Sequence, residues 1–245
     1  SVTSTRRITS AMKMVAAAKL RRAQEMALSA RPYAERMERM LTSLSASAAA
    51  NPQSAPPMLA AGADDTHLLL LITSDRGLCG GFNATLVRFT RRRIAELEAA
   101  GKTVKLMIVG RKGVAALRQY AGDRLIESFE DLSKPRPGFD KAEQVSARVT
   151  AMFEAGELDV CTVIYNKFVS VMTQDVTPLQ LIPFQAVTEN DAEPAEISGP
   201  TGIYEFEPDE DEILAALLPR TLSVQVFRAM LDSFPSAQAS RLPAW

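Results

Sequence analysis

The first part of the chain carries apolar and small residues at alternating steps of three and four. From Thr9 to Leu44 these steps select Thr9, Met12, Ala16, Lys19, Ala23, Met26, Ala30, Tyr33, Met37, Met40 and Leu44. A spacing of about 3.5 residues is the period of helices that supercoil around one another. The pattern therefore predicts one long helix with a seam for a second helix. Pro32 lies inside this pattern and predicts a kink or break near 29–31, because proline removes a backbone hydrogen bond.

A loose connector separates this helix from an alternation of strands and helices. Residues 43–66 contain three prolines and have low complexity, which is typical of a linker. Short apolar runs then predict strands that alternate with amphipathic helices. The strands are expected at 67–74, 104–109, 124–129 and 160–165, and the helices at 83–99, 114–120 and 139–155. This order predicts an open parallel sheet with helices on both faces. The segment 168–184 predicts a further strand pair, and 203–208 a last edge strand.

A second helical pattern follows Pro208. Steps of four and three select Ile213, Leu217, Arg220, Val224, Phe227, Leu231 and Phe234. Pro235 and Pro243 each lack a backbone donor, so the regular helix is expected to end near Phe234. Two helical arms around an α/β body predict an antiparallel coiled coil standing on a globular foot. The expected divisions are an N-terminal helix at 1–50, a linker at 51–66, an α/β foot at 67–208 and a C-terminal helix at 209–245.

The composition excludes several functional classes. Apolar runs are short, such as the five residues of Leu68–Ile72, whereas a membrane-spanning helix needs about 20. Two cysteines and one histidine among 245 residues leave no basis for a disulfide scaffold, a zinc site or a Ser–His–Asp triad. We therefore expect no catalytic residue, no cofactor and no metal in this chain.

Charge is distributed unevenly, although the formal net charge is only −1. Residues 1–24 contain six basic residues and no acid, and residues 168–219 contain eleven acids and no Lys or Arg. Such segregation indicates charged surfaces that face partners. The basic run lacks interleaved aromatic residues, so a protein partner is favoured over nucleic acid.

One glycine-rich turn raises the question of nucleotide binding. The sequence SDRGLCGGFN (74–83) follows the first strand and opens a helix, where nucleotide-binding folds hold phosphates. Gly77, Gly80 and Gly81 match neither the dinucleotide fingerprint nor the P-loop. A basic sequence at 111–112 also stands where a ribose-binding acid is expected. A tight, partner-facing turn is favoured, and a soluble α/β nucleotide-binding enzyme using Gly77–Gly81 is the alternative.

Two single residues near this turn are interpreted as structural. Cys79 has no histidine or paired carboxylate nearby in the sequence, so it is expected to be a small packed residue. His67 precedes the first strand and is expected to be a solvated residue at the edge of the sheet.

Several segments together resemble one protein family. They are ITSAMKMVAAAKLRRAQ (8–24), ARPYAERM (30–37), TSDRGLCGGFN (73–83), YNKF (165–168), TPLQLIP (177–183) and YEFEPDEDEILAALLPR (204–220). In this combination and order the chain resembles the gamma subunit of the F-type rotary ATP synthase. The resemblance implies an α/β protein whose long terminal helices form an antiparallel coiled-coil shaft on a Rossmann-like, open-sheet foot.

The resemblance also implies a function and a set of partners. The shaft would turn inside the ring of alpha and beta subunits, while the foot binds epsilon and the membrane rotor ring. Rotation would couple proton flow to ATP synthesis on the beta subunits, and delta would belong to the same soluble sector. The chain would then be non-catalytic and peripheral to the membrane, on the cytoplasmic face of the bacterial inner membrane or, as second choice, at the mitochondrial inner membrane.

Site residues follow from the same resemblance, position by position. Those expected to face the alpha and beta subunits are Arg7, Met12, Lys13 and Lys19. Those expected to lie near the rotor ring and epsilon are Arg31, Pro32, Tyr33, Tyr204, Glu205 and Glu207. The first residue, Ser1, and the closing SAQASRLPAW (236–245) indicate a fragment without the start of the first helix and most of the last one.

Overall fold

The computed structural model describes the α/β body and the second long helix, together with part of the first segment. The described residues are 56–59, 62–132, 137–170, 173–184 and 210–241, and a subset of the positions from 7 to 42. Side chains are described from 217 onward in the last of these ranges. The expected edge strand at 203–208 lies outside the described residues.

A five-stranded sheet forms the centre of the body. Its strands are β1 (Thr66–Ile72), β2 (Thr103–Val109), β3 (Leu125–Phe129), β4 (Val160–Phe168) and β5 (Gln174–Ile182), in the order β3-β2-β1-β4-β5. β1 is central and pairs in parallel with β2 and β4, in the registers Leu69↔Leu106 and Leu69↔Thr162. The chain moves outward from β1 first in one direction and then in the other, as in doubly wound folds.

The edge of the sheet formed by β4 and β5 differs from the expectation. β5 pairs with β4 in the antiparallel direction, so the sheet is mixed rather than parallel. The segment 168–184 contributes one new strand and not a strand pair, because β4 itself continues to Phe168 and forms a hairpin with β5. The helix–strand alternation from 66 to 168 is confirmed.

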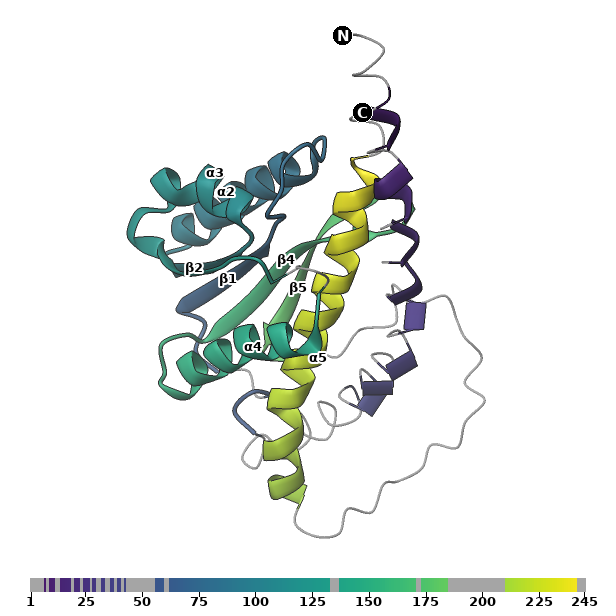
Figure 1. The fold of residues 1–245 in the computed structure, drawn as a ribbon. Helices are drawn as coiled ribbons and strands as arrows, with labels where there is room; N and C mark the ends of the chain where they lie inside the picture. Colours follow the sequence, from purple (N-terminus) through teal and green to yellow (C-terminus); the bar gives the residue numbers. More distant parts are fainter. Residues whose placement is uncertain are drawn as a thin grey trace.

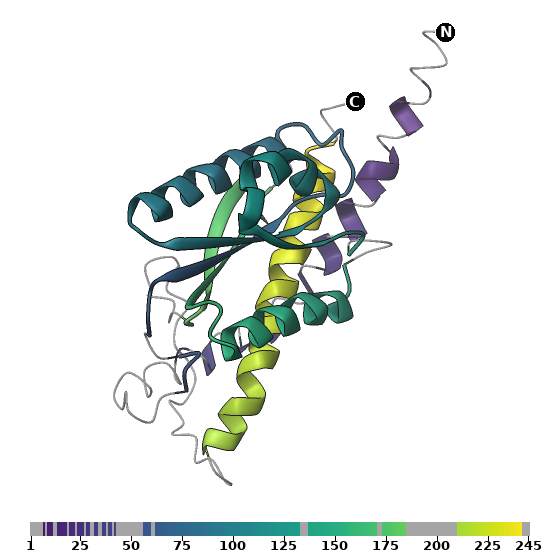
Figure 2. The ribbon, with the colours of Figure 1, turned by 90° about the vertical axis from the view of Figure 1, so that its left-hand side faces the viewer.

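Two helical layers cover the sheet, one on each face (Figures 1 and 2). α2 (Phe82–Ala99) and α3 (Arg111–Ala121) bury Leu86 and Leu117 against the face that carries Leu69 and Leu71. α4 (Phe139–Glu154) and α5 (Glu210–Ala239) cover the opposite face. This division follows from β1 itself, because successive side chains point to opposite faces of a strand and those from Leu68 to Ile72 are all apolar.

The second face holds the larger core. Leu68, Leu70 and Ile72 of β1 pack in one cluster with residues of α4 and α5. Met58 and Leu59, inside the segment expected to be a loose connector, also belong to this cluster, and the amide of Phe184 donates to the carbonyl of Met58 at 3.0 Å. The expectation of a loose connector is therefore wrong at these two residues, because their apolar side chains are packed in the core and removed from water.

His67 also differs from the expectation. Its side chain is buried, and Nε2 lies 2.8 Å from Asp64 Oδ1. The other carboxylate oxygen of Asp64 forms an ion pair with Lys102. β1 is the central strand, so its first residues are enclosed by β2 and β4. The position therefore requires a polar partner for the ring rather than solvent.

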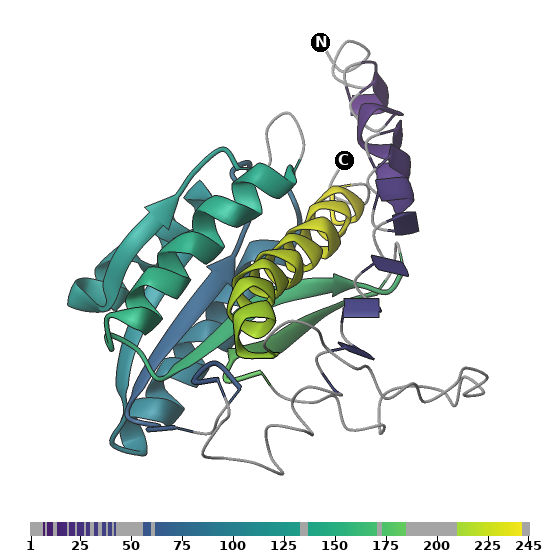
Figure 3. The ribbon, with the colours of Figure 1, turned by 90° about the horizontal axis from the view of Figure 1, so that it is seen from below.

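α5 is the longest described helix, with 30 residues. It crosses the sheet diagonally beside α4 (Figure 3), and Leu218, Leu222 and Val226 pack in the cluster of the second face. The helix continues through Pro235 to Ala239, so the expected end near Phe234 is wrong. Burial compensates for the missing backbone bond, because Pro235, Ser236 and Ala237 are all enclosed.

In the first segment, every described position between Arg7 and Thr42 has helical backbone. These pieces run alongside α5 in the opposite direction (Figures 1 and 3). Ala16, Leu20 and Met37 are buried, and Met40 packs against the second-face core. Ala16, Met37 and Met40 were expected in the seam, whereas Tyr33 was expected there and is 50% exposed.

Candidate functional site

The turn after β1 is held together by its own side chains. The amide of Ser74 donates to Asn83 Oδ1 at 3.1 Å, and Asn83 Nδ2 donates to Ser74 Oγ at 2.9 Å and to Cys79 Sγ at 3.1 Å. Cys79 is only 3% exposed, which confirms the expectation of a packed residue. Leu78 has φ +56° and is 65% exposed. A non-glycine residue with a positive φ is conformationally strained. The contacts around the turn, and not the backbone preference of Leu78, therefore determine the conformation of this loop.

Glycine is required at only some of the positions in and beside this turn. Gly80 has φ +50°, and a Cβ there would lie 3.2 Å from the carbonyl oxygen of Ser240. Gly81, by contrast, has φ −77°, and a Cβ there would meet only Thr85 Cγ2 at an ordinary 4.0 Å, so a side chain is allowed. The requirement is also strict between β2 and α3. Gly110, in the turn, has φ +101° and a Cβ there would collide with the carbonyl of Thr73, and a Cβ on Gly113 in the first turn of α3 would lie 2.6 Å from Thr73 Oγ1. Thr73 Oγ1 accepts the amide of Gly113 at 3.0 Å, so this glycine allows α3 to approach β1 closely.

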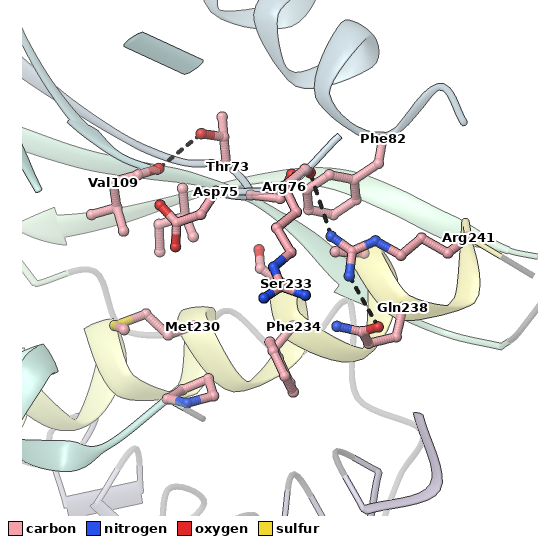
Figure 4. Close-up of a pocket in the computed structure, with 14 residues that line it drawn as sticks. Thr73, Asp75, Arg76, Phe82, Val109, Met230, Ser233, Phe234, Gln238 and Arg241 are labelled. Atoms are coloured by element: carbon pink, nitrogen blue, oxygen red, sulfur yellow. Dashed lines mark hydrogen bonds between the residues drawn. The ribbon is translucent and has the colours of Figure 1, made fainter. Parts of the chain in front are cut away.

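A cavity of about 580 Å³ opens between this turn and α5 (Figure 4). Thr73, Asp75 and Arg76 line it from the carboxyl ends of the strands, and Met230, Phe234 and Arg241 line it from the helix. Its position is where doubly wound folds bind ligands, and its volume is in the range of small-molecule sites. Position and size alone therefore leave the nucleotide-binding alternative open.

The charges at this edge differ from those of a dinucleotide site. Arg111, after β2, lies 3.3 Å from Glu130 and also pairs with Asp131, so a cation occupies the place of a ribose-binding acid. The carboxyl of Asp131 and the neighbouring acids hold the pKa of Arg111 above its usual value. Arg241 bonds to Gln238 Oε1 at 3.2 Å and to the carbonyl of Arg76 at 3.4 Å (Figure 4), and burial lowers its pKa.

Reactive chemistry is sparse in the part of the chain that the structure describes. Burial raises the pKa of the Cys161 thiol to about 12, so the reactive thiolate is not available near neutral pH. Among the described residues, no three His, Cys, Asp or Glu side chains gather closely enough to hold a metal ion. Within the same residues, no helix has the length and apolar character needed to cross a membrane.

The structure describes three of the expected partner-facing residues. Arg7 and Pro32 are exposed, and Tyr33 is half exposed, all on helical backbone. The others lie outside the described residues: Met12, Lys13, Lys19, Arg31, Tyr204, Glu205 and Glu207. Among the three that are described, Pro32 and Tyr33 are consecutive, and Arg7 lies 25 positions earlier in the first segment.

Sequence reasoning missed the polar residues of α5 that meet the sheet. Ser233 and Ser236 are buried and bond to the backbone of Asn166 in β4. The signal was present as two serines three residues apart on the helix. A pattern of apolar residues at helical spacing does not include serines, so it does not point to these two positions.

Together, these features define a mixed α/β protein in which a long, enclosed helix is packed across a five-stranded sheet. The family model described as ATP synthase matches residues 1–245. The chain is 54% identical over 245 residues to the ATP synthase gamma chain of Paramagnetospirillum magneticum, and 49% identical over 250 residues to that of Rhodospirillum rubrum. Each alignment covers 100% of this chain and 82% of the relative. The chain belongs to the family of ATP synthase gamma chains.

A solved structure supports the same fold. The chain is similar to one in the central stalk and c-ring of the Tetrahymena thermophila mitochondrial ATP synthase, with 26% identity and a TM-score of 0.70. The match covers 97% of both chains. The fold described above is therefore the one found in a rotor assembly of known structure.

Proposed function

We propose that this chain is the central rotor subunit of an F-type ATP synthase. It couples proton flow through the membrane to ATP synthesis at the beta-subunit sites by rotation, and it contributes no catalytic residue, cofactor or metal of its own. The identity to ATP synthase gamma chains over the whole chain carries this proposal. The chain acts as part of the ATP synthase complex, peripheral to the membrane on its cytoplasmic face in a bacterium.

The shaft of this rotor is an antiparallel coiled coil of α5 with the N-terminal segment. Val224 and Leu231 of α5 are buried, yet neither belongs to the two clusters around the sheet. A second helix on that side explains their burial, and the helical pieces alongside α5 supply one (Figure 3). Ala16 and Leu20 are buried on those pieces. Small residues such as Ala16 allow two helices to pack closely.

Two surfaces connect the shaft and the foot to their neighbours. Arg7, Met12, Lys13 and Lys19 face the alpha and beta subunits. The basic charge of Arg7, Lys13 and Lys19 interacts with acidic partner surfaces without deep pockets. The set Arg31, Pro32, Tyr33, Tyr204, Glu205 and Glu207 faces the membrane rotor ring and epsilon, and delta completes the soluble sector. The exposure of Arg7 and Tyr33 supports these assignments.

Co-expression with alpha and beta subunits tests the proposal. We expect the chain to co-purify with them in a stoichiometric complex that hydrolyses ATP. Arg7→Glu should lower ATP-driven proton pumping relative to hydrolysis in the membrane-bound complex. The matched control is Arg36→Glu, a charge reversal at another exposed, helical arginine of the same segment. Equal pumping by both variants would mean that Arg7 is not part of the surface that contacts the alpha and beta subunits.

A calorimetric titration separates this function from the enzyme alternative. A rotor subunit that leaves catalysis to the beta subunits has no need to bind nucleotide itself. We therefore expect no saturable binding of ATP or NAD to the isolated chain. Saturable binding that is lost in Gly80→Val would instead support a nucleotide site at the turn after β1.

A further inference from the structure

Two serines of the C-terminal part of α5, and a third directly after its end at Ala239, contact the β4–β5 hairpin. Ser233, Ser236 and Ser240 are spaced at i, i+3 and i+7, the spacing of a single helical face. Ser233 is 5% exposed and Ser236 is 0% exposed. Farther toward the N-terminus, the helix packs on the sheet through apolar residues such as Leu222 and Val226. The contact between α5 and the sheet therefore changes in character along the helix.

The strand geometry explains why polar residues are needed there. The pairing of β1 with β4 ends at Leu71↔Ile164, but β4 continues to Phe168 and its last residues pair only with β5. In an antiparallel pair, the N–H and C=O of one residue point to the same side of the strand. At Asn166, opposite Val176 of β5, both groups point away from β5. They face the space that β1 would fill if it were longer.

α5 supplies the partners that β1 does not. The amide of Asn166 donates to Ser233 Oγ at 3.3 Å. Ser236 Oγ donates to the carbonyl of Asn166 at 3.2 Å and shares its proton with the carbonyl of Asp232 at 2.9 Å. Ser240 Oγ extends the contact by donating to Gln174 Oε1 in β5 at 2.7 Å. The helix thus takes the place of a neighbouring strand for one buried residue.

These bonds constrain α5 in a way that apolar contacts do not. Apolar packing is non-directional, so a small slide or rotation along a smooth surface changes its free energy little. A buried N–H or C=O that loses its partner is costly to the fold. Because Ser233 and Ser236 bond to the same residue, both rotation and translation of α5 would break at least one bond.

We propose that Ser233 and Ser236 are positioning residues that lock the register of α5 on β4. Torque applied to the helix is thereby delivered to the sheet and the foot instead of being lost in slippage. This inference rests on the rotor function proposed above. The lock requires only the two hydroxyl groups, the backbone of Asn166 and the early end of β1.

Hydrogen exchange in the assembled ATP synthase tests the contact itself. Ser233→Ala removes the acceptor of the Asn166 amide, and we expect that amide to exchange roughly fivefold faster, the factor for loss of one net hydrogen bond. The matched control is Thr221→Val on the same helix. Thr221 is also buried, but its hydroxyl bonds only to the carbonyl of Leu217 within α5. Unchanged exchange at Asn166 in Ser233→Ala would overturn the lock.

The coupling ratio tests the role in torque transfer. We expect the double variant Ser233→Ala with Ser236→Ala to assemble, to hydrolyse ATP and to pump severalfold fewer protons per ATP than the Thr221→Val complex. If the double variant does not assemble, the two single variants provide the same comparison. Normal pumping ratios in the serine variants would overturn the role in torque. Failure of the unmodified chain to assemble or pump would instead overturn the proposed function, while the exchange result would still test the contact.

Discussion

α2 and α5 cover opposite faces of the same sheet but are built differently. α2 buries one stripe, Phe82, Leu86, Thr90, Ile94 and Leu97, and exposes arginines on its other side. α5 is buried around most of its circumference from Leu218 to Ala239. A helix that covers a sheet needs only one apolar stripe. The burial of α5 on most sides therefore indicates that it packs against a second element in addition to the sheet.

Two stripes on α5 account for this enclosure. Leu218, Leu222, Val226 and Met230 belong to the core of the second face. Val224 and Leu231 form part of the stripe expected from the sequence and lie outside that core. Phe227, expected in the same stripe, instead meets Phe139 of α4 edge to face, with ring centroids 5.6 Å apart. α5 is thus at once a layer of the foot and the start of the proposed shaft.

We expect the two helices to differ most in how much a charge costs on the side that faces away from the sheet. Val224→Asp should lower the free energy of unfolding by about 3–5 kcal/mol, the cost of an uncompensated buried charge. Arg88→Asp on the exposed side of α2 should change it by about 0.5 kcal/mol or less. Urea unfolding of the isolated chain measures both. A loss below about 1 kcal/mol in Val224→Asp would mean that this side of α5 is open to water.

The second prediction concerns how the helices of the α2–α3 face approach the sheet. Gly113→Ala should destabilise the chain by about 1–3 kcal/mol, because its Cβ would collide with Thr73 and force a shift of α3. Gly81→Ala is the control, since φ and space both allow a side chain there, and it should be neutral or stabilise by about 0.4–1 kcal/mol. Thermal unfolding distinguishes these signs, and equal losses would contradict the geometry at Thr73.

The third prediction concerns a polar contact within the α4–α5 layer. The hydroxyls of Ser146 and Ser223 lie 2.6 Å apart and are buried. Ser223→Ala should cost about 1 kcal/mol, the net value of a typical hydrogen bond. A double-mutant cycle with Ser146→Ala isolates the pair. A coupling energy near zero would show that the helices are held by apolar contacts alone.

The smallest effect is expected at the opposite end of the sheet, in the Asp64–Lys102 pair. Its N–O distance is 2.8 Å, and the hydrogen bond from Lys102 lowers the pKa of Asp64 below its ordinary 3.8. A lowered carboxyl pKa stabilises the fold above the ordinary value, and this contribution is lost as the pH falls through the folded-state pKa. Lys102→Gln should therefore lower the melting temperature slightly at pH 6 and hardly at all near pH 2. An equal difference at both pH values would contradict the assignment.

The hydrophobic pattern predicted most of the foot because its elements are short and strongly patterned. The expected helix at 83–99 and strand at 104–109 differ from α2 and β2 by a single residue at one end. β5 was harder, since Gln174–Ile182 contains Pro178 and half-buried polar residues. Its antiparallel direction depends on the hairpin with β4, which a local pattern does not specify.

The sequence by itself determined the order of the elements, the apolar core of β1 and the family resemblance, because each is local in the chain or spread over many residues. Tertiary structure decided which residues share an environment. His67 became buried because β1 is central, and Gly113 is constrained by Thr73, 40 positions earlier. Ser233 and Ser236 meet the backbone of β4 because β4 continues beyond the end of β1. Backbone groups left without a partner by one pairing must be satisfied by another part of the chain.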